Sequence, residues 1–192
     1  MTPRPPTLTA TSYRLLVGAL MCALYMALWF VVDAGGRLWN ADGLADLPFL
    51  PAFVRVAGFL MIGLWIIPSL FSAFAILTII GAMAYPELGL AEQLGLGVFV
   101  ASGGPLALAL TVRVTQMSTD LVDVGVRDVV ALSLACAAGN AILYNAGLTI
   151  LGLGVPGVNL GAVIFLGDIL GSMIMLGLAL GAARIAGGRA PT

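Results

Sequence analysis

The chain has 192 residues, of which 61% are hydrophobic and 9% are charged, and its formal net charge at pH 7 is −1. An ordinary soluble domain carries about 25% charged residues, so this composition excludes a soluble globule and predicts an integral membrane protein. The few basic residues form no cluster, which excludes nucleic acid as a partner because its phosphates require clustered Lys or Arg.

The sequence up to residue 51 predicts a tail, one membrane span and a long loop. Residues 1–13 are rich in Pro and Thr and predict a flexible N-terminal tail. Residues 15–32 contain no charge and have about the length that crosses a bilayer. A signal peptide is the alternative, but the run is longer than a usual signal-peptide core and no Ala-x-Ala site follows, so we favour a retained anchor. Residues 33–51 hold Gly, Asp, Trp39 and two prolines, which indicates a loop at a membrane surface.

Residues 52–84 decide between five and six membrane crossings. This apolar segment, which contains Arg55 and Pro68, is long for one span and barely enough for two. A break between Gly63 and Pro68, where proline removes a backbone donor, gives six crossings and leaves one arginine, Arg37, in an outer loop. One long helix gives five crossings and leaves two arginines outside. The positive-inside rule therefore favours six crossings with both termini in the cytoplasm, and five crossings are the alternative.

The next span, over residues 94–112, is interrupted by Ser102 and then by Gly103, Gly104 and Pro105. Two glycines and a proline in mid-membrane predict a kink or an unwound turn, which is tolerated where the freed carbonyls face protein or water. The kink either packs against neighbouring helices or lines a ligand site, and in the second case Ser102 belongs to that site.

The charged residues 111–128 predict the main cytoplasmic loop, and an apolar span over residues 129–154 follows. Asn140 and Tyr144 interrupt this span and, being four residues apart, share a helix face. An Asn in a membrane span most often forms a hydrogen bond to a neighbouring helix. Ligand binding is the alternative role for these two side chains.

Asp168 is the single carboxylate in the last apolar run, residues 157–181. A charge at the centre of a membrane helix costs about 2.5 to 3.5 kcal/mol on insertion scales, so an intramembrane Asp normally faces a partner or a cavity. Gly157, Gly161 and Gly171 lie on the Asp168 side of the helix, and small residues let a neighbouring backbone come close. We expect Gly161, Gly167 and Gly171 to pack against another helix of the chain.

The predicted topology brings four polar side chains, from four spans, to similar depths in the outer half of the membrane. At 1.5 Å per residue, Asp168 and Ser102 lie about 12 Å from the outer ends of their spans, and Asn140 lies about 16 Å from the inner end of its span. Arg55 is the only basic residue available there to neutralise Asp168. We predict one ligand-binding site of Asp168, Arg55, Asn140, Ser102 and Tyr144, with Asp168 as the charged anchor. Alternatively, Arg55 reaches the outer headgroups while Asp168 is protonated or bonded to Asn140.

The sequence contains no His and no Lys, no cluster of metal ligands, and no nucleophile beside a base at a recognisable spacing. It therefore predicts no enzyme, no metal site and no cofactor. A sensor and a transporter component both predict a polar pocket, whereas a structural subunit predicts polar residues that satisfy one another.

Several short motifs, in their order along the chain, resemble the first family of membrane-associated sensor domains, the MASE type. An apolar run with a proline passes through a turn at residues 63–71, an Arg-Asp pair at 127–128 begins a later helix, and the last helix carries Gly-Asp-Ile-Leu-Gly at 167–171. The resemblance covers residues 50–184. Members of that family usually precede a kinase or cyclic-dinucleotide output domain. We find no such domain in this sequence and expect a stand-alone ligand-binding or accessory subunit, or a module whose partner is a separate cytoplasmic signalling protein.

The fold expected from these observations is an all-α bundle of six transmembrane helices, or five, in a bacterial inner membrane with both termini cytoplasmic. One transmembrane domain, residues 14–186, lies between tails at 1–13 and 187–192. The expected function is a sensor-like or small-ligand-binding module that acts through a partner protein. The alternatives are the substrate-binding component of a small-molecule transporter, with an energising subunit as partner, and a structural subunit of a membrane complex.

Overall fold

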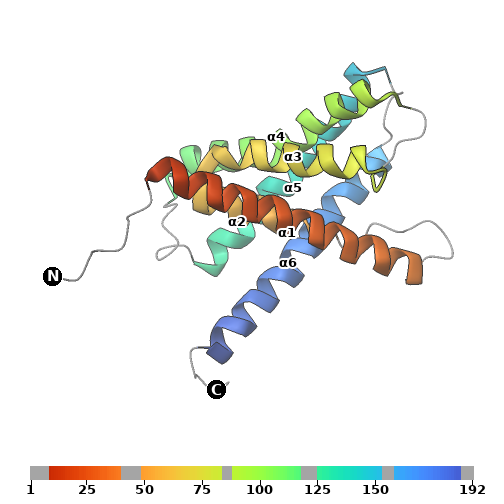
Figure 1. The fold of residues 1–192 in the computed structure, drawn as a ribbon. Coiled ribbons are helices and arrows are strands. Elements are labelled where there is room, and N and C mark those ends of the chain that lie inside the picture. Colours follow the sequence, from red (N-terminus) through yellow and green to blue (C-terminus); the bar gives the residue numbers. More distant parts are fainter. Residues whose placement is uncertain (1–8, 40–48, 84–87, 118–124, 153–157, 187–192) are drawn as a thin grey trace.

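The computed structural model describes residues 9–39, 49–83, 88–117, 125–152 and 158–186, and within these ranges all regular structure is helical (Figure 1). The helices are α1 (Ala10–Trp39), α2 (Ala52–Ile62), α3 (Ile66–Ile79), α4 (Leu90–Thr115), α5 (Val126–Ile150) and α6 (Val158–Ala186). A short 3-10 turn, η1 (Gly63–Trp65), joins α2 to α3. The prediction of an all-α protein is confirmed.

Helix α1 is longer than the predicted span at both ends. It begins at Ala10, within the expected tail, and the hydroxyl oxygen of Thr9 caps it by accepting a hydrogen bond from the Ser12 backbone N–H at 3.2 Å. It continues to Trp39, through seven residues that we expected to be a loop. A helix satisfies its own backbone groups, which favours helical structure at a membrane despite the two glycines in this stretch. Residues 1–8, 40–48 and 187–192, which include parts of the expected tails and loop, lie outside the described residues.

Five segments are long and apolar enough to cross a membrane, which supports the membrane class. These segments are Ala10–Gly35, Ala52–Ile79, Leu90–Thr115, Val126–Ile150 and Leu160–Leu178. By this measure the count is five rather than six, because residues 52–79 make one segment. Helix α2 has 11 residues, a length of about 16 Å, and is too short to cross a hydrocarbon core of about 30 Å alone.

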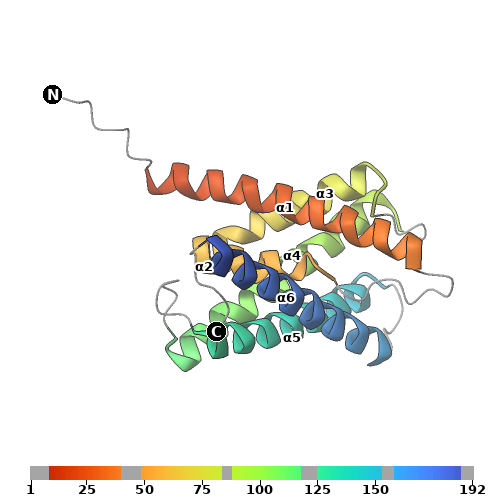
Figure 2. The same cartoon turned by 90° about the horizontal axis from the view of Figure 1, so that it is seen from below.

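Helix α2 runs antiparallel to α1. Arg55, in the first turns of α2, lies against the ring of Tyr25. One turn later, a Cβ atom added at Gly58 would lie 3.5 Å from Cγ of Met21. Arg55 therefore contacts Tyr25, and the later residue Gly58 contacts the earlier residue Met21, as expected for antiparallel helices. Figure 2 shows α2 returning toward the end of the bundle from which α1 starts.

Helix α3 runs parallel to α1, so the chain reverses at η1. The guanidinium of Arg14 lies over the ring of Trp65, with 5.5 Å between its central carbon and the ring centroid. Four residues later on both helices, a Cβ at Gly18 would lie 2.6 Å from the Ser69 hydroxyl. The reversal occurs at Gly63, where φ is +61°, a backbone conformation that glycine adopts more readily than other residues. The break therefore lies at the start of the stretch in which the sequence predicts it.

Helix α4 continues through Gly103, Gly104 and Pro105 without an unwound turn. The glycines instead allow α4 and α5 to approach closely. A Cβ at Gly103 would lie 2.7 Å from the carbonyl oxygen of Gly139, and a Cβ at Gly139 would lie 2.6 Å from the carbonyl oxygen of Gly103. Small residues at such a crossing let two backbones touch. This contact places Asn140 directly beside α4.

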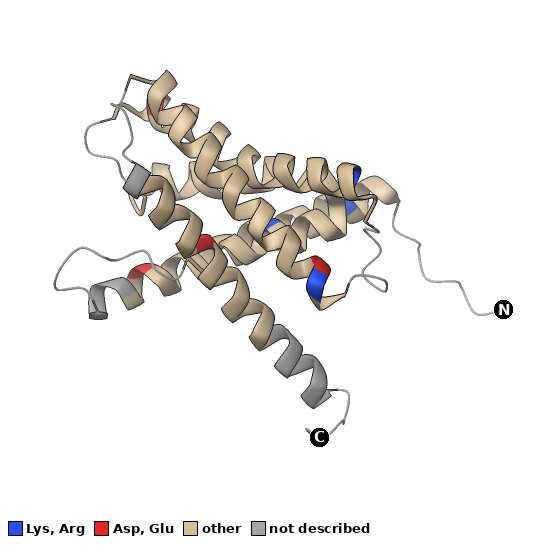
Figure 3. Cartoon of the chain, turned by 180° about the vertical axis from the view of Figure 1, so that it is seen from behind, with Lys and Arg blue, Asp and Glu red and all other residues tan. Residues whose placement is uncertain are grey.

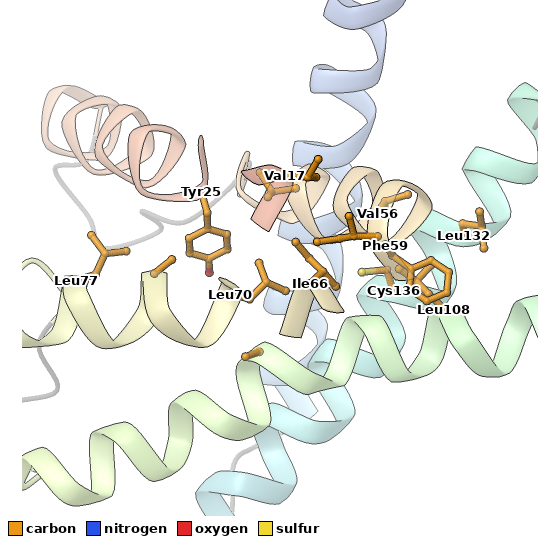
Figure 4. Packing of buried hydrophobic residues seen from close by; sticks show 14 residues of the cluster. Val17, Tyr25, Val56, Phe59, Ile66, Leu70, Leu77, Leu108, Leu132 and Cys136 are labelled. Carbon is orange, nitrogen blue, oxygen red and sulfur yellow. The ribbon is translucent and has the colours of Figure 1, made fainter. Parts of the chain in front are cut away.

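Helix α2 lies at the centre of the bundle, in contact with α1, α4, α5 and α6. The main hydrophobic cluster combines side chains of α1 to α5, among them those labelled in Figure 4. Its members on α2 are Val54, Val56, Phe59 and Ile62. Because neighbouring helices surround it, α2 exposes little of its first two turns, including Arg55, to the outside of the bundle.

The charged residues of the described chain gather at the helix ends, except for one acidic and one basic position inside the bundle (Figure 3). The arginines Arg14, Arg113 and Arg127 are exposed and belong to one end, at the start of α1, the end of α4 and the start of α5. We call this the basic end. The two interior charges are Arg55 and Asp168, which are both buried.

Candidate functional site

Arg55 and Asp168 form a buried ion pair between α2 and α6. Nη1 of Arg55 donates a hydrogen bond to Oδ2 of Asp168 at 3.0 Å. Arg55 is 1% exposed and Asp168 is 2% exposed. The alternative in which Arg55 extends to the outer headgroups does not apply, because the surrounding helices enclose its side chain. The pairing that the sequence predicts between these two residues is present.

Asn140 of α5 joins the ion pair at the same oxygen atom. Its Nδ2 donates a hydrogen bond of 2.7 Å to Oδ2 of Asp168, and the residue is 3% exposed. Three helices, α2, α5 and α6, therefore meet at one carboxylate oxygen. We call Arg55, Asn140 and Asp168 the polar triad. Hydrogen bonds to an ionised group are stronger than bonds between neutral groups, and low-dielectric surroundings increase the difference.

Two aromatic rings lie beside the guanidinium of Arg55. The central carbon of this guanidinium is 5.5 Å from the ring centroid of Phe49 and 5.9 Å from that of Tyr25. The two rings contact each other edge to face, with centroids 6.2 Å apart. Aromatic faces attract a cation at such distances, by about 0.5 to 2 kcal/mol. Tyr25 projects from α1 into the core (Figure 4), so α1 also contributes to the surroundings of the triad.

Gly167 and Gly171, on either side of Asp168, lie in close contact with Phe49 and Leu50, the residues just before α2. The backbone N–H of Phe49 donates a hydrogen bond of 3.0 Å to the carbonyl oxygen of Gly167. A Cβ at Gly171 would collide with the carbonyl group of Phe49 and would lie 2.8 Å from the backbone nitrogen of Leu50. We expected Gly167 and Gly171 to contact another helix, but their close neighbour is this segment, because α2 begins beside the middle of α6.

Gly161, by contrast, packs against helix α5. A Cβ at this position would lie 2.7 Å from Nδ2 of Asn145. Here the expected contact with another helix of the chain is present.

Ser102 and Tyr144 were also predicted to line the site, and they lie on α4 and α5. Ser102 is half-buried on α4, beside the Gly103 contact. Tyr144 packs against a second hydrophobic cluster that includes Phe74 and Leu96. It lies one turn beyond Asn140, about 6 Å along α5, and both side chains share a helix face.

Sequence reasoning missed four residues around the triad: Tyr25, Phe49, Gly104 and Cys136. A Cβ at Gly104 would lie 2.6 Å from Sγ of Cys136 and 3.1 Å from Cδ of Arg55, so these three residues pack together. Tyr25, Gly104 and Cys136 occur within apolar runs that contain many similar residues, and Phe49 lies in the predicted loop of residues 33–51. Only the two glycines before Pro105 gave a signal, and it indicated a kink rather than a contact with Arg55.

Two polar atoms of the triad remain without a hydrogen-bond partner among the described residues. They are the donor Nε of Arg55 and the acceptor Oδ1 of Asn140, and both are buried. Most buried polar atoms in proteins have a partner, and each exception needs an explanation such as a bound molecule. The triad can therefore offer one donor and one acceptor to a small molecule while the ion pair stays intact. In the described part of the chain, no three His, Cys, Asp or Glu side chains gather as metal ligands would.

Comparison with known proteins finds no matching family model, no matching curated protein and no matching solved structure. A functional proposal for this chain therefore rests on the geometry of the triad. The resemblance to MASE-type sensor domains stays a prediction.

Proposed function

We propose that this protein is a sensor-like module of the membrane, which binds a small polar molecule at the polar triad and acts through a partner protein. The observation that carries the proposal is the pair of buried, unpartnered atoms, Arg55 Nε and Asn140 Oδ1. A purely structural polar cluster gains most when every member is satisfied, because a buried unpaired group costs about 1 to 3 kcal/mol. A ligand that completes these hydrogen bonds favours the conformation in which it binds.

Helix α2 provides a short route from the triad to the surface of the bundle. Arg55 lies seven residues before Ile62, the last residue of α2, a distance of about 10 Å along the helix. The reversal at η1 follows directly, and its Trp65 is 52% exposed. A ligand that changes the ion pair between Arg55 and Asp168 shifts α2. Because η1 follows α2 directly, η1 shifts with it, and a partner bound at η1 responds to this movement.

The basic end of the bundle lies in the cytoplasm, with both termini on that side. Three exposed arginines, Arg14, Arg113 and Arg127, support this orientation, since membrane proteins retain Arg and Lys on the cytoplasmic side. With both termini on one side the chain must cross the membrane an even number of times, so α2, although too short to cross alone, belongs to a sixth pass. Trp65 at η1 suits a position at the cytoplasmic interface, where Trp side chains are enriched.

Cysteine labelling checks this orientation. Leu90 and Val126 are exposed residues at the first positions of α4 and α5, at opposite ends of the bundle. We expect a membrane-impermeant maleimide to label Leu90→Cys in intact cells and to label Val126→Cys only after the membrane is opened. The unmodified chain, whose two cysteines lie within membrane segments, serves as the control. Labelling of Val126→Cys from outside would contradict the orientation.

The partner is a cytoplasmic signalling protein, which the resemblance of residues 50–184 to MASE-type sensor domains supports. A transporter component is the second candidate, and the break between α2 and α3 favours it, because substrate sites of transporters often lie at discontinuous helices. The two candidates differ in the partner that they require.

Purification in mild detergent, followed by mass spectrometry, distinguishes these partners. We expect a kinase or a nucleotide cyclase to co-purify with the parent chain and to be depleted in the Trp65→Ala variant. Leu178→Ala on α6, another exposed apolar residue, is the matched control and should retain the partner. An ATPase in place of the signalling protein would support the transporter candidate. The absence of any protein that distinguishes the two variants would contradict a role through η1.

A further inference from the structure

The two unpartnered atoms of the polar triad are complementary in type and close to the same carboxylate oxygen. Arg55 contacts Asp168 through Nη1 and leaves Nε without a partner, and Asn140 contacts Asp168 through Nδ2 and leaves Oδ1 without a partner. Nε carries a hydrogen and only donates, whereas Oδ1 only accepts. A molecule that satisfies both atoms must therefore present one acceptor and one donor.

The charge balance of the triad restricts the molecule further. Arg55 and Asp168 neutralise each other, and Asn140 is neutral, so the triad has no net charge. An added anion would place an unpaired negative charge beside Asp168, and an added cation would place an unpaired positive charge beside Arg55. Either charge is costly in surroundings that are otherwise apolar, such as the core around Val54. A neutral molecule preserves the balance.

Close packing on one side of Arg55 limits the size of the molecule. Gly104 and Cys136 lie against the Cδ side of the Arg55 chain, where not even a methyl group could be added at Gly104 without a shift. The Nε–H bond points away from Cδ, so the unpartnered donor faces the other side. Nε of Arg55 and Oδ1 of Asn140 are themselves buried, so only a small molecule can reach both atoms.

From these observations, and resting on the proposed function, we infer that the ligand is a small neutral molecule with an acceptor and a donor bonded to the same carbon atom, as in a primary amide. Its carbonyl oxygen accepts the hydrogen bond from Nε of Arg55. Its N–H group donates to Oδ1 of Asn140. The ion pair with Asp168 remains in place.

Nuclear magnetic resonance of the full chain, labelled with 15N-arginine in detergent micelles, tests this assignment. All eight basic residues are arginines, and the Nε–H signal of the buried one is identified by its slow exchange with solvent. The probes are acetamide, acetate and acetone, which share a shape but differ in charge and donors. We expect acetamide to shift the buried Nε–H signal saturably, with an affinity about tenfold or more above that of acetate or acetone, since each of these lacks the donor.

The outcomes separate this inference from the proposed function. If acetate shifts the buried signal at equal or lower concentration, the site binds a ligand but the neutral class is wrong. If acetone binds as well as acetamide, the donor to Asn140 plays no part and the inference is also wrong. If none of the three shifts the signal, both the inference and ligand binding at the triad are overturned.

A variant at Asn140 provides a second readout. Asn140→Leu removes the acceptor and keeps a side chain of similar size, and its fold is checked by the positions of the other arginine signals. We expect the acetamide shift to be lost in this variant and retained in Arg113→Gln, where the change lies at an exposed arginine of the basic end. Retention of the shift in Asn140→Leu would overturn the assigned role of Oδ1.

Discussion

Asp168→Asn lowers the stability of the bundle by about 3 to 5 kcal/mol, the amount typical for breaking a buried ion pair. The variant leaves Arg55 buried with its charge uncompensated. The guanidinium cannot lose its proton in a protein, so the charge remains. The rings of Tyr25 and Phe49 offset only about 0.5 to 2 kcal/mol of this cost. Thermal unfolding in detergent, followed by circular dichroism, measures the loss.

Arg55→Gln is expected to be less harmful than Asp168→Asn, because a carboxylate without its partner can take up a proton and become neutral. The double variant removes both charges and should be more stable than the sum of the two single losses predicts. A coupling of roughly 1 kcal/mol or more in this cycle is expected for side chains in direct contact. Additive losses, or a larger loss for Arg55→Gln than for Asp168→Asn, would contradict the ion pair.

Gly171→Leu is the second large effect that we expect. A Cβ at Gly171 meets the carbonyl group of Phe49 and the nitrogen of Leu50, which are backbone atoms and cannot rotate away as a flexible side chain can. Overpacking usually lowers the free energy of unfolding by about 1 to 3 kcal/mol. Because the added side chain collides with backbone atoms, we expect a loss at the upper end of this range or above it. The variant should separate the start of α2 from α6 and lower both the yield and the unfolding temperature.

Gly177→Leu, on the same helix, is the matched control for this substitution. Nothing lies within 4 Å of a Cβ at Gly177. The change is therefore expected to leave the unfolding temperature unchanged or to raise it slightly, since leucine favours helix more than glycine does. If the variants at Gly171 and Gly177 unfold alike, the segment before α2 does not pack on α6 as described.

The polar triad could be predicted from the sequence for an energetic reason. Asp168 is a charge in an apolar run and requires a partner, and Arg55 was the only basic residue at a comparable depth. Helical rise alone gives the depth of a residue, so Asn140 could be assigned to the same level. The contacts of 3.0 Å and 2.7 Å with Asp168 agree with that reasoning.

The contacts of Ser102 and Tyr144 could not be predicted in the same way. Depth and helix face restrict a side chain to within about a turn, whereas a hydrogen bond requires an approach of about 3 Å. Tyr144 shares a face with Asn140 and nevertheless packs against the cluster that includes Phe74. Which of two neighbouring turns reaches Asp168 depends on how α5 crosses α4 and α6.

The reversal between α2 and α3 could be predicted from the sequence in part, whereas the position of α2 in the bundle could not. The sequence favours a break between Gly63 and Pro68, because glycine and proline disfavour a continuous helix there. The length of α2, 11 residues, its start beside Gly171 and its enclosure by neighbouring helices follow from tertiary packing. Apolarity, charge and backbone preference are properties of single residues, so the sequence alone is enough to assess them. Close contacts such as those of Phe49 and Tyr25 with Arg55 depend on how distant helices pack together, and many apolar residues of this chain would satisfy the same pattern.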